Sequence, residues 1–130
     1  MSLSDPNLNF LSGGGEMGEF TRNYNWSSTP VGSPEQWPQS LKTIVSTILR
    51  CKFPMFLWWG KDLIQFYNDA YRPSMGNNGK HPEALGAKGA DTWPEIWPVI
   101  YPLIQQVLQQ RLDLLIFLTQ KFHSPFGLIK

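Results

Sequence analysis

The sequence predicts an α+β fold in which a β-hairpin leads into a short helix and is flanked by longer ones. Two apolar runs, Met55–Trp59 and Leu63–Tyr67, have the length and the aromatic and branched side chains typical of strands. Gly60 to Asp62 separates them, and a glycine that tolerates positive φ favours a tight turn between antiparallel strands. Asn68 and Asp69, two residues that commonly cap helices, follow directly. The segment therefore predicts a strand, a turn, a second strand and one helical turn.

An amphipathic helix is expected ahead of this hairpin. Ser33–Gln36 has the residue types that begin a helix, but Pro38 interrupts it, so we expect the sustained helix to begin at Pro38. Apolar residues then recur with helical spacing at Leu41, Ile44, Val45, Ile48 and Leu49. This stripe either packs on the sheet or forms a homodimer, and periodicity alone does not distinguish the two. The candidate dimer-interface residues are Leu41, Ile44, Val45 and Ile48.

A second long helix is expected after a glycine-rich loop. Thr92 is placed to cap it, with Glu95 at the capping-box position, so we expect a helix from about Pro94 to Gln109. Pro98 and Pro102 fall inside this range, and because an interior proline costs about 3 kcal/mol, the helix should be bent. Its expected apolar face comprises Ile96, Val99, Ile100, Leu103, Val107 and Leu108.

The N-terminal residues 1–32 are polar and glycine-rich, which predicts a flexible arm ahead of a single domain at residues 33–130. The run Gly13–Gly15 is not a phosphate loop, because no Gly-Lys-Ser/Thr follows it and no strand precedes it. Tyr24, Trp26 and Val31 have side chains suited to packing the end of the arm onto the domain.

Composition and charge argue against several classes of function. The net charge is +1 with no run of basic residues, so neither nucleic acid nor an anionic membrane surface is an expected partner. No stretch approaches the ~20 apolar residues that span a bilayer, and a single cysteine forms no disulfide within the chain, which fits the cytoplasm. His81 and His123, the two histidines, lack metal-ligand spacing. We find no catalytic constellation, so neither a metal nor an enzymatic activity is expected.

Four motifs resemble, in the same order, the N-terminal PAS domain of a group of bacterial sensor histidine kinases. They are FPMFLWWG at Phe53–Gly60, FYNDAYRP at Phe66–Pro73, GKHPEALG at Gly79–Gly86 and WPEIWP at Trp93–Pro98. The resemblance extends over roughly residues 18–110. It implies a PAS-like antiparallel sheet with flanking helices, and a sensory domain in two-component signal transduction that binds a small molecule or senses through its dimer interface.

This resemblance also implies which partners the chain has. The downstream partner would be a histidine kinase module in a full-length parent, since nothing in this chain resembles a phosphoacceptor-histidine helix or an ATP site. The alternative is a ligand-free PAS module that serves dimerisation or protein interaction. A ligand that can be titrated distinguishes the two.

The expected ligand pocket lies between the sheet and the helices above it. Alternation along the strands and analogy with the PAS fold give its candidate lining as Phe56, Trp58, Phe66, Tyr67, Asn68, Tyr71, Trp93 and Trp97. The simpler interpretation is an aromatic core, with Asn68 as a helix cap. Haem is disfavoured because the long helix holds no histidine ligand, and photoreactive flavin is disfavoured because Cys51 precedes the first strand.

The last residues, 111–130, depart from the PAS pattern. Three more strands would follow in that family, whereas this chain has room for two, at Leu112–Phe122 and Phe126–Ile129. Loss of the last strand would leave one edge of the first strand unpaired. We therefore expect an incomplete sheet whose open edge is covered by a second copy or by the tail itself. Truncation, a shifted reading frame and divergence each account for such a tail.

Overall fold

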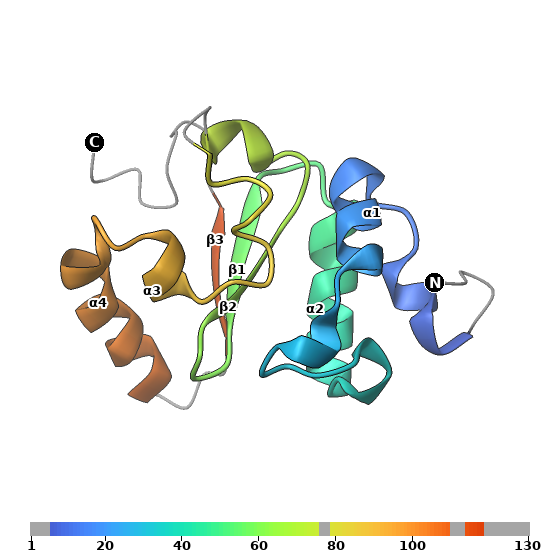
Figure 1. Ribbon diagram of the computed structural model, residues 1–130, viewed down its shortest axis with the longest axis horizontal. Coiled ribbons are helices and arrows are strands. Elements are labelled where there is room, and N and C mark those ends of the chain that lie inside the picture. The colour runs from blue at the N-terminus through green and yellow to red at the C-terminus, as the bar shows by residue number, and fades with distance from the viewer. Residues whose placement is uncertain (1–5, 76–78, 110–113, 119–130) are drawn as a thin grey trace.

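The computed structural model describes residues 6–75, 79–109 and 114–118, and the fold over these residues is α+β, as predicted (Figure 1). Its elements in chain order are η1 (Pro6–Leu11), α1 (Gly15–Asn23), η2 (Trp26–Ser28), η3 (Pro34–Gln36), α2 (Gln39–Arg50), β1 (Met55–Trp59), β2 (Ile64–Tyr67), η4 (Arg72–Met75), α3 (Gly89–Thr92), α4 (Trp97–Gln109) and β3 (Leu114–Leu118), where η marks a 3-10 helix. Figure 1 shows α1 and α2 on one side of the strands and α3 and α4 on the other.

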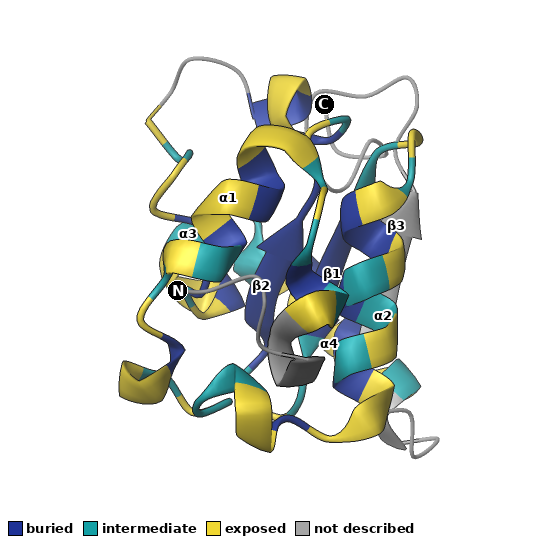
Figure 2. Ribbon diagram, turned by 90° about the vertical axis from the view of Figure 1, so that its right-hand side faces the viewer, coloured by how far each residue is buried: buried dark blue, intermediate teal, exposed yellow. Residues whose placement is uncertain are grey.

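The hairpin forms as predicted, with one shift at its turn. β1 and β2 pair antiparallel from Phe56 opposite Tyr67 to Trp59 opposite Ile64. Leu63, expected to begin the second strand, lies in the turn at φ 52°, so β2 begins one residue later. All four residues of β2 are buried because helices or loops cover both faces of the sheet (Figure 2).

The open edge of β1 is covered by the tail of this chain. β3 pairs antiparallel with β1 from Met55 opposite Leu118 to Trp59 opposite Leu114, which gives the strand order β2-β1-β3. Of the two alternatives for the edge, the tail itself is therefore the one found. The predicted strand Phe126–Ile129 lies outside the described residues.

Helix α2 begins directly after Pro38, as predicted, and its apolar stripe packs inside the chain. Leu41, Val45 and Ile48 are fully buried, and Ile44 is half-buried against the same core. The helix contacts both β1 and β2 as well as η1. Of the two interpretations of the stripe, packing on the sheet matches this arrangement. Among the four residues of the expected dimer interface, Ile44 alone is not fully buried.

The N-terminal arm differs from the flexible segment that we expected. Over residues 6–32 it folds back onto α2, and Leu11, Met17 and Trp26 are fully buried. The expectation failed because these residues are isolated in sequence and join one core cluster only when the chain folds. Positive φ at Gly13 to Gly15 turns the chain tightly against Leu49, so the glycines allow close packing here.

The second long helix starts later than predicted. Thr92 ends the short helix α3, and α4 begins at Trp97, which places Pro98 in its first turn, where proline is tolerated. Pro102 alone is interior. The expected apolar face is only partly buried. Ile100 is buried, whereas Val99 and Leu103 are exposed.

Among the residues that the structure describes, no helix combines the length and hydrophobicity needed to cross a bilayer.

Candidate functional site

One face of the sheet carries a cluster of buried aromatic rings. Phe56 lies at its centre, with ring centroids 5.5 Å from Trp58, 5.7 Å from Tyr67, 5.0 Å from Tyr71 and 6.2 Å from Trp93. Strand alternation explains the arrangement, because Phe56 and Trp58 are two residues apart and Tyr67 lies opposite Phe56 in the register. We call Phe56, Trp58, Tyr67, Tyr71 and Trp93 the aromatic cluster.

Two of the aromatic residues predicted to line the pocket lie outside this cluster. Phe66 points to the opposite face of the sheet, where its ring stacks on Trp26 at 4.9 Å and meets Trp37 at 5.6 Å. Its inclusion in the pocket lining was wrong, because it neighbours Tyr67 in β2 and successive side chains alternate between faces. Trp97 is half-buried at the margin, with its ring 5.7 Å from that of Trp58.

Asn68 has a structural role that occupies its whole side chain. Its Nδ2 donates to the carbonyl oxygens of Ile48, Cys51 and Phe53 at 2.9, 3.2 and 2.8 Å. Its Oδ1 accepts hydrogen bonds from the backbone N–H groups of Met55 and Tyr71 at 3.2 and 3.0 Å. Since a primary amide has two donor hydrogens, no capacity remains for a ligand. Asn68 is thus a cap, as the simpler interpretation held, and it also ties the end of α2 to the hairpin.

Gln65, which is not among the predicted site residues, also belongs to the site. This fully buried amide accepts hydrogen bonds at Oε1 from the indole N–H groups of Trp58 and Trp93, both at 2.9 Å. Its Nε2 donates to the Ala84 carbonyl at 2.9 Å and to the Thr92 hydroxyl at 2.8 Å. A polar residue inside an otherwise apolar strand was the available signal, because such a group must find partners when buried.

Tyr67 and His81 form a neutral hydrogen-bonded pair at the edge of the aromatic cluster. The Tyr67 hydroxyl lies 2.8 Å from Nδ1 of His81. Burial raises the pKa of Tyr67 well above its ordinary value, and the nearby Glu83 carboxylate adds to this. Burial also lowers the pKa of His81, helped by the positive charge of Arg72. Both groups therefore favour their neutral forms.

The hydroxyl of Tyr71 is buried without a hydrogen-bond partner in the described structure. The side chain is fully buried, and burial raises the pKa of its hydroxyl far above the ordinary value. An unpaired buried hydroxyl costs about 1–3 kcal/mol, so most such groups in proteins are paired with protein or with a bound molecule. Within the aromatic cluster, Tyr71 thus has unused hydrogen-bonding capacity.

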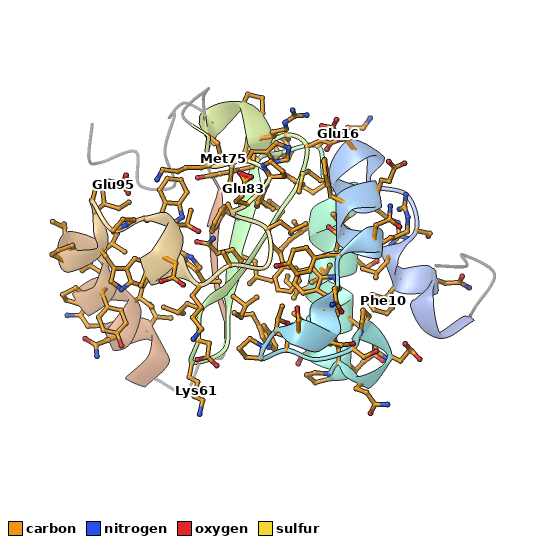
Figure 3. The ribbon with its side chains drawn as sticks, in the orientation of Figure 1. Phe10, Glu16, Lys61, Met75, Glu83 and Glu95 are labelled. Carbon is orange, nitrogen blue, oxygen red and sulfur yellow. The ribbon has the colours of Figure 1, made fainter. Side chains whose placement is uncertain are left out.

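Lys80 fastens the loop that covers one side of the aromatic cluster. Its Nζ donates to the Thr92 carbonyl at 2.6 Å, pairs with the Glu95 carboxylate at 3.1 Å, and lies 4.8 Å from the centre of the Trp93 ring. In Figure 3, Glu83 of this loop lies at the end of the strands opposite to Lys61, which marks the hairpin turn.

The described residues contain no group of three or more His, Cys, Asp or Glu side chains suited to a metal ion.

The molecule is thus an α+β protein with a closed aromatic cluster on one face of its sheet, held by two buried amides and containing one unpartnered hydroxyl. Comparisons with models of protein families, with curated proteins and with solved structures found no match.

Proposed function

We propose that this chain is a PAS-like sensory domain of a bacterial signal-transduction histidine kinase and that it binds a small organic molecule at the aromatic cluster. In this role it acts in the cytoplasm and passes a change to a kinase module in a full-length parent. The four motifs that resemble the PAS family support the proposal because each contributes to the cluster or to its immediate shell. In sequence order, the first motif supplies Phe56 and Trp58 and the second supplies Tyr67 and Tyr71. The third supplies His81 and Ala84, and the fourth supplies Trp93.

The unpartnered hydroxyl of Tyr71 is the observation that carries the proposal. The rings around it are apolar, and the other polar groups of the cluster bind one another: Gln65 with the two indoles, and Tyr67 with His81. A ligand that suits this site is small and mostly apolar, with one hydrogen-bonding atom aimed at Tyr71. Buried ligand sites commonly have this composition, with apolar walls and a few polar groups that set orientation.

The proposed activity is binding rather than catalysis. Tyr67 and His81, the titratable pair of the site, are hydrogen-bonded to each other, and burial favours the neutral form of each. A catalytic acid or base would instead need a pKa near the working pH and access to a reacting group.

The variant Tyr71→Phe tests the proposal. It removes the unpaired hydroxyl and keeps the ring, so the unliganded protein should be as stable as the wild type or more stable by up to about 1 kcal/mol. A thermal-shift panel of small aromatic compounds, each with one hydrogen-bonding group, should give hits on the wild type that weaken at least tenfold in Tyr71→Phe. Tyr101→Phe is the matched control, because it removes a hydroxyl outside the cluster. Hits that bind Tyr71→Phe as well as the wild type would contradict the proposed site.

A ligand-free interaction module is the second candidate function. The observation that favours it is the exposed apolar surface of α4, where Val99 and Leu103 lie at the surface. A wild-type protein that associates with a partner copy but gives no hit in the same panel would select this candidate.

A further inference from the structure

The aromatic cluster is closed to solvent. Of its five side chains, Phe56, Trp58 and Tyr71 are fully buried, while Tyr67 is 1% exposed and Trp93 4%. A buried group is reached from outside only when part of the structure around it opens. A molecule that contacts the Tyr71 hydroxyl must therefore displace one of the segments that cover the cluster.

The covering loop, which we define as residues 79–86, contacts two rings of the cluster. Nζ of Lys80 lies 4.8 Å from the centre of the Trp93 ring, and Nδ1 of His81 lies 2.8 Å from the Tyr67 hydroxyl. Figure 1 draws this loop in yellow, and backbone hydrogen bonds place it alongside β2. Displacement of Lys80 and His81 would thus uncover the cluster at Trp93 and Tyr67.

The end of the covering loop at Gly86 is firmly attached to the rest of the protein. The backbone N–H of Gly86 donates to the Gln65 carbonyl at 2.9 Å, and the N–H of Gln65 donates to the Ala87 carbonyl at 3.1 Å. Leu85 is buried, and a Cβ on Gly86 would collide with the ring of Tyr24. This end of the loop is therefore fixed.

The other end of the covering loop is held by side chains. Gly79 has φ 85°, and among the described residues no atom lies within 4 Å of a Cβ built there, so the backbone has room to turn at this glycine. Lys80 follows directly, and its Nζ donates to the Thr92 carbonyl at 2.6 Å and pairs with the Glu95 carboxylate at 3.1 Å. These contacts fasten the loop to the segment that carries Trp93.

We propose that the covering loop is the gate through which a small molecule enters the aromatic cluster, a proposal that rests on the function proposed above. The loop swings outward at Gly79, stays attached at Gly86 and opens when the Lys80 contacts break. Pro82 and Glu83, between its two ends, are exposed, so the loop moves into solvent rather than through packed structure. Lys80 is thus the latch of the gate.

Hydrogen exchange at the tryptophan indoles, followed by NMR on the full chain without ligand, tests the gate. The buried indole N–H of Trp93 donates to Oε1 of Gln65, so it exchanges with solvent only when the cluster opens. Lys80→Met keeps an apolar stem and removes the charged group, so Trp93 should exchange faster by on the order of tenfold. Lys88→Met is the matched control, because Lys88 is an exposed lysine just beyond the loop, and it should leave the Trp93 rate unchanged.

The urea dependence of the same exchange separates a gate from unfolding of the whole chain. Opening of one loop exposes little surface, so the Trp93 rate in the wild type should hardly change in urea below the unfolding transition. A Trp93 rate that rises with urea as steeply as global unfolding would overturn the proposal, because the cluster would then open only when the chain unfolds. So would a Trp93 rate that Lys80→Met leaves unchanged.

A compound that binds in the thermal-shift panel gives the second readout. If it leaves through the gate, it should dissociate about tenfold faster from Lys80→Met than from the wild type, with Lys88→Met unchanged. Equal dissociation rates would overturn the loop as the route. The exchange experiment uses no ligand, so a panel without hits would contradict the ligand site while the Trp93 rates still decide whether the loop opens.

Discussion

Two buried side-chain amides set the geometry of the candidate site at the scale of single residues. Asn68 fixes where β1 starts and where the chain turns after β2, and Gln65 fixes the two indole rings above the sheet. The role of Asn68 was predictable, since Asn commonly caps the turn that follows it. That of Gln65 was not, because its partners are set by tertiary packing: Trp93 and Thr92 lie 28 and 27 residues away.

Replacing Gln65 should destabilise the fold strongly. Gln65→Leu keeps the bulk but removes the buried acceptor that the indole N–H groups of Trp58 and Trp93 share, at an expected cost of about 2–4 kcal/mol. Urea unfolding measures this loss, with the exposed Gln105→Leu as control. A loss for Gln65→Leu no larger than that of the control would show that the amide is not a structural centre.

The pair formed by Tyr67 and His81 should make stability depend on pH. The folded-state pKa of His81 lies below its unfolded value, so below about pH 6.5 the unfolded chain takes up a proton that the folded chain resists. Stability from this group is therefore fully present at neutral pH and falls as the pH drops from the unfolded pKa towards the folded one. The difference in unfolding free energy between pH 7.5 and 5.5 should shrink in His81→Gln. An unchanged difference would mean that His81 titrates alike in both states.

At the scale of elements, α1 shows why local sequence patterns predicted only part of the fold. Asp69 was expected to cap the turn that follows it in sequence. Its carboxylate instead accepts hydrogen bonds from the backbone N–H groups of Glu16 and Met17, at 3.0 and 2.7 Å, and so caps α1 from more than fifty residues away. Arg72 beside it pairs with the side chain of Glu16. Strand and helix periodicities found β1, β2 and α2, whereas the N-terminal arm is folded by such long-range contacts, which no local pattern contains.

Gly15 should be sensitive to substitution because of this distant cap. Gly15 has φ 62°, and a Cβ there would collide with the Asp69 carboxylate and displace it, so Gly15→Ala should cost about 2 kcal/mol from strain and the lost cap together. Gly32→Ala is the matched control, since Gly32 has φ 75° with open space around it, and should cost about 1 kcal/mol from strain alone. Chemical denaturation compares the two. Equal losses would mean that the Asp69 cap contributes nothing measurable.

At the scale of the whole molecule, the four sequence motifs meet around one face of the sheet although they are spread over residues 53–98. Alternation in β1 and β2 was enough to predict that Phe56, Trp58 and Tyr67 share this face, but the same rule had to place Phe66 on the other. The pairing of the tail with β1 was predictable only as one of two ways to cover the edge of β1, because strand pairing is decided by residues distant in sequence. The exposed face of α4 was missed, because periodicity alone does not say how much of an apolar helix its own chain will cover.

Native mass spectrometry of the purified protein after incubation with a metabolite extract tests whether a ligand binds at the aromatic cluster. We expect a reproducible extra mass on the folded wild type that is released on denaturation and strongly reduced in Tyr71→Phe, while Tyr101→Phe retains it. Folded wild-type protein that carries only its polypeptide mass, or an equal extra mass on Tyr71→Phe, would contradict a ligand at the aromatic cluster.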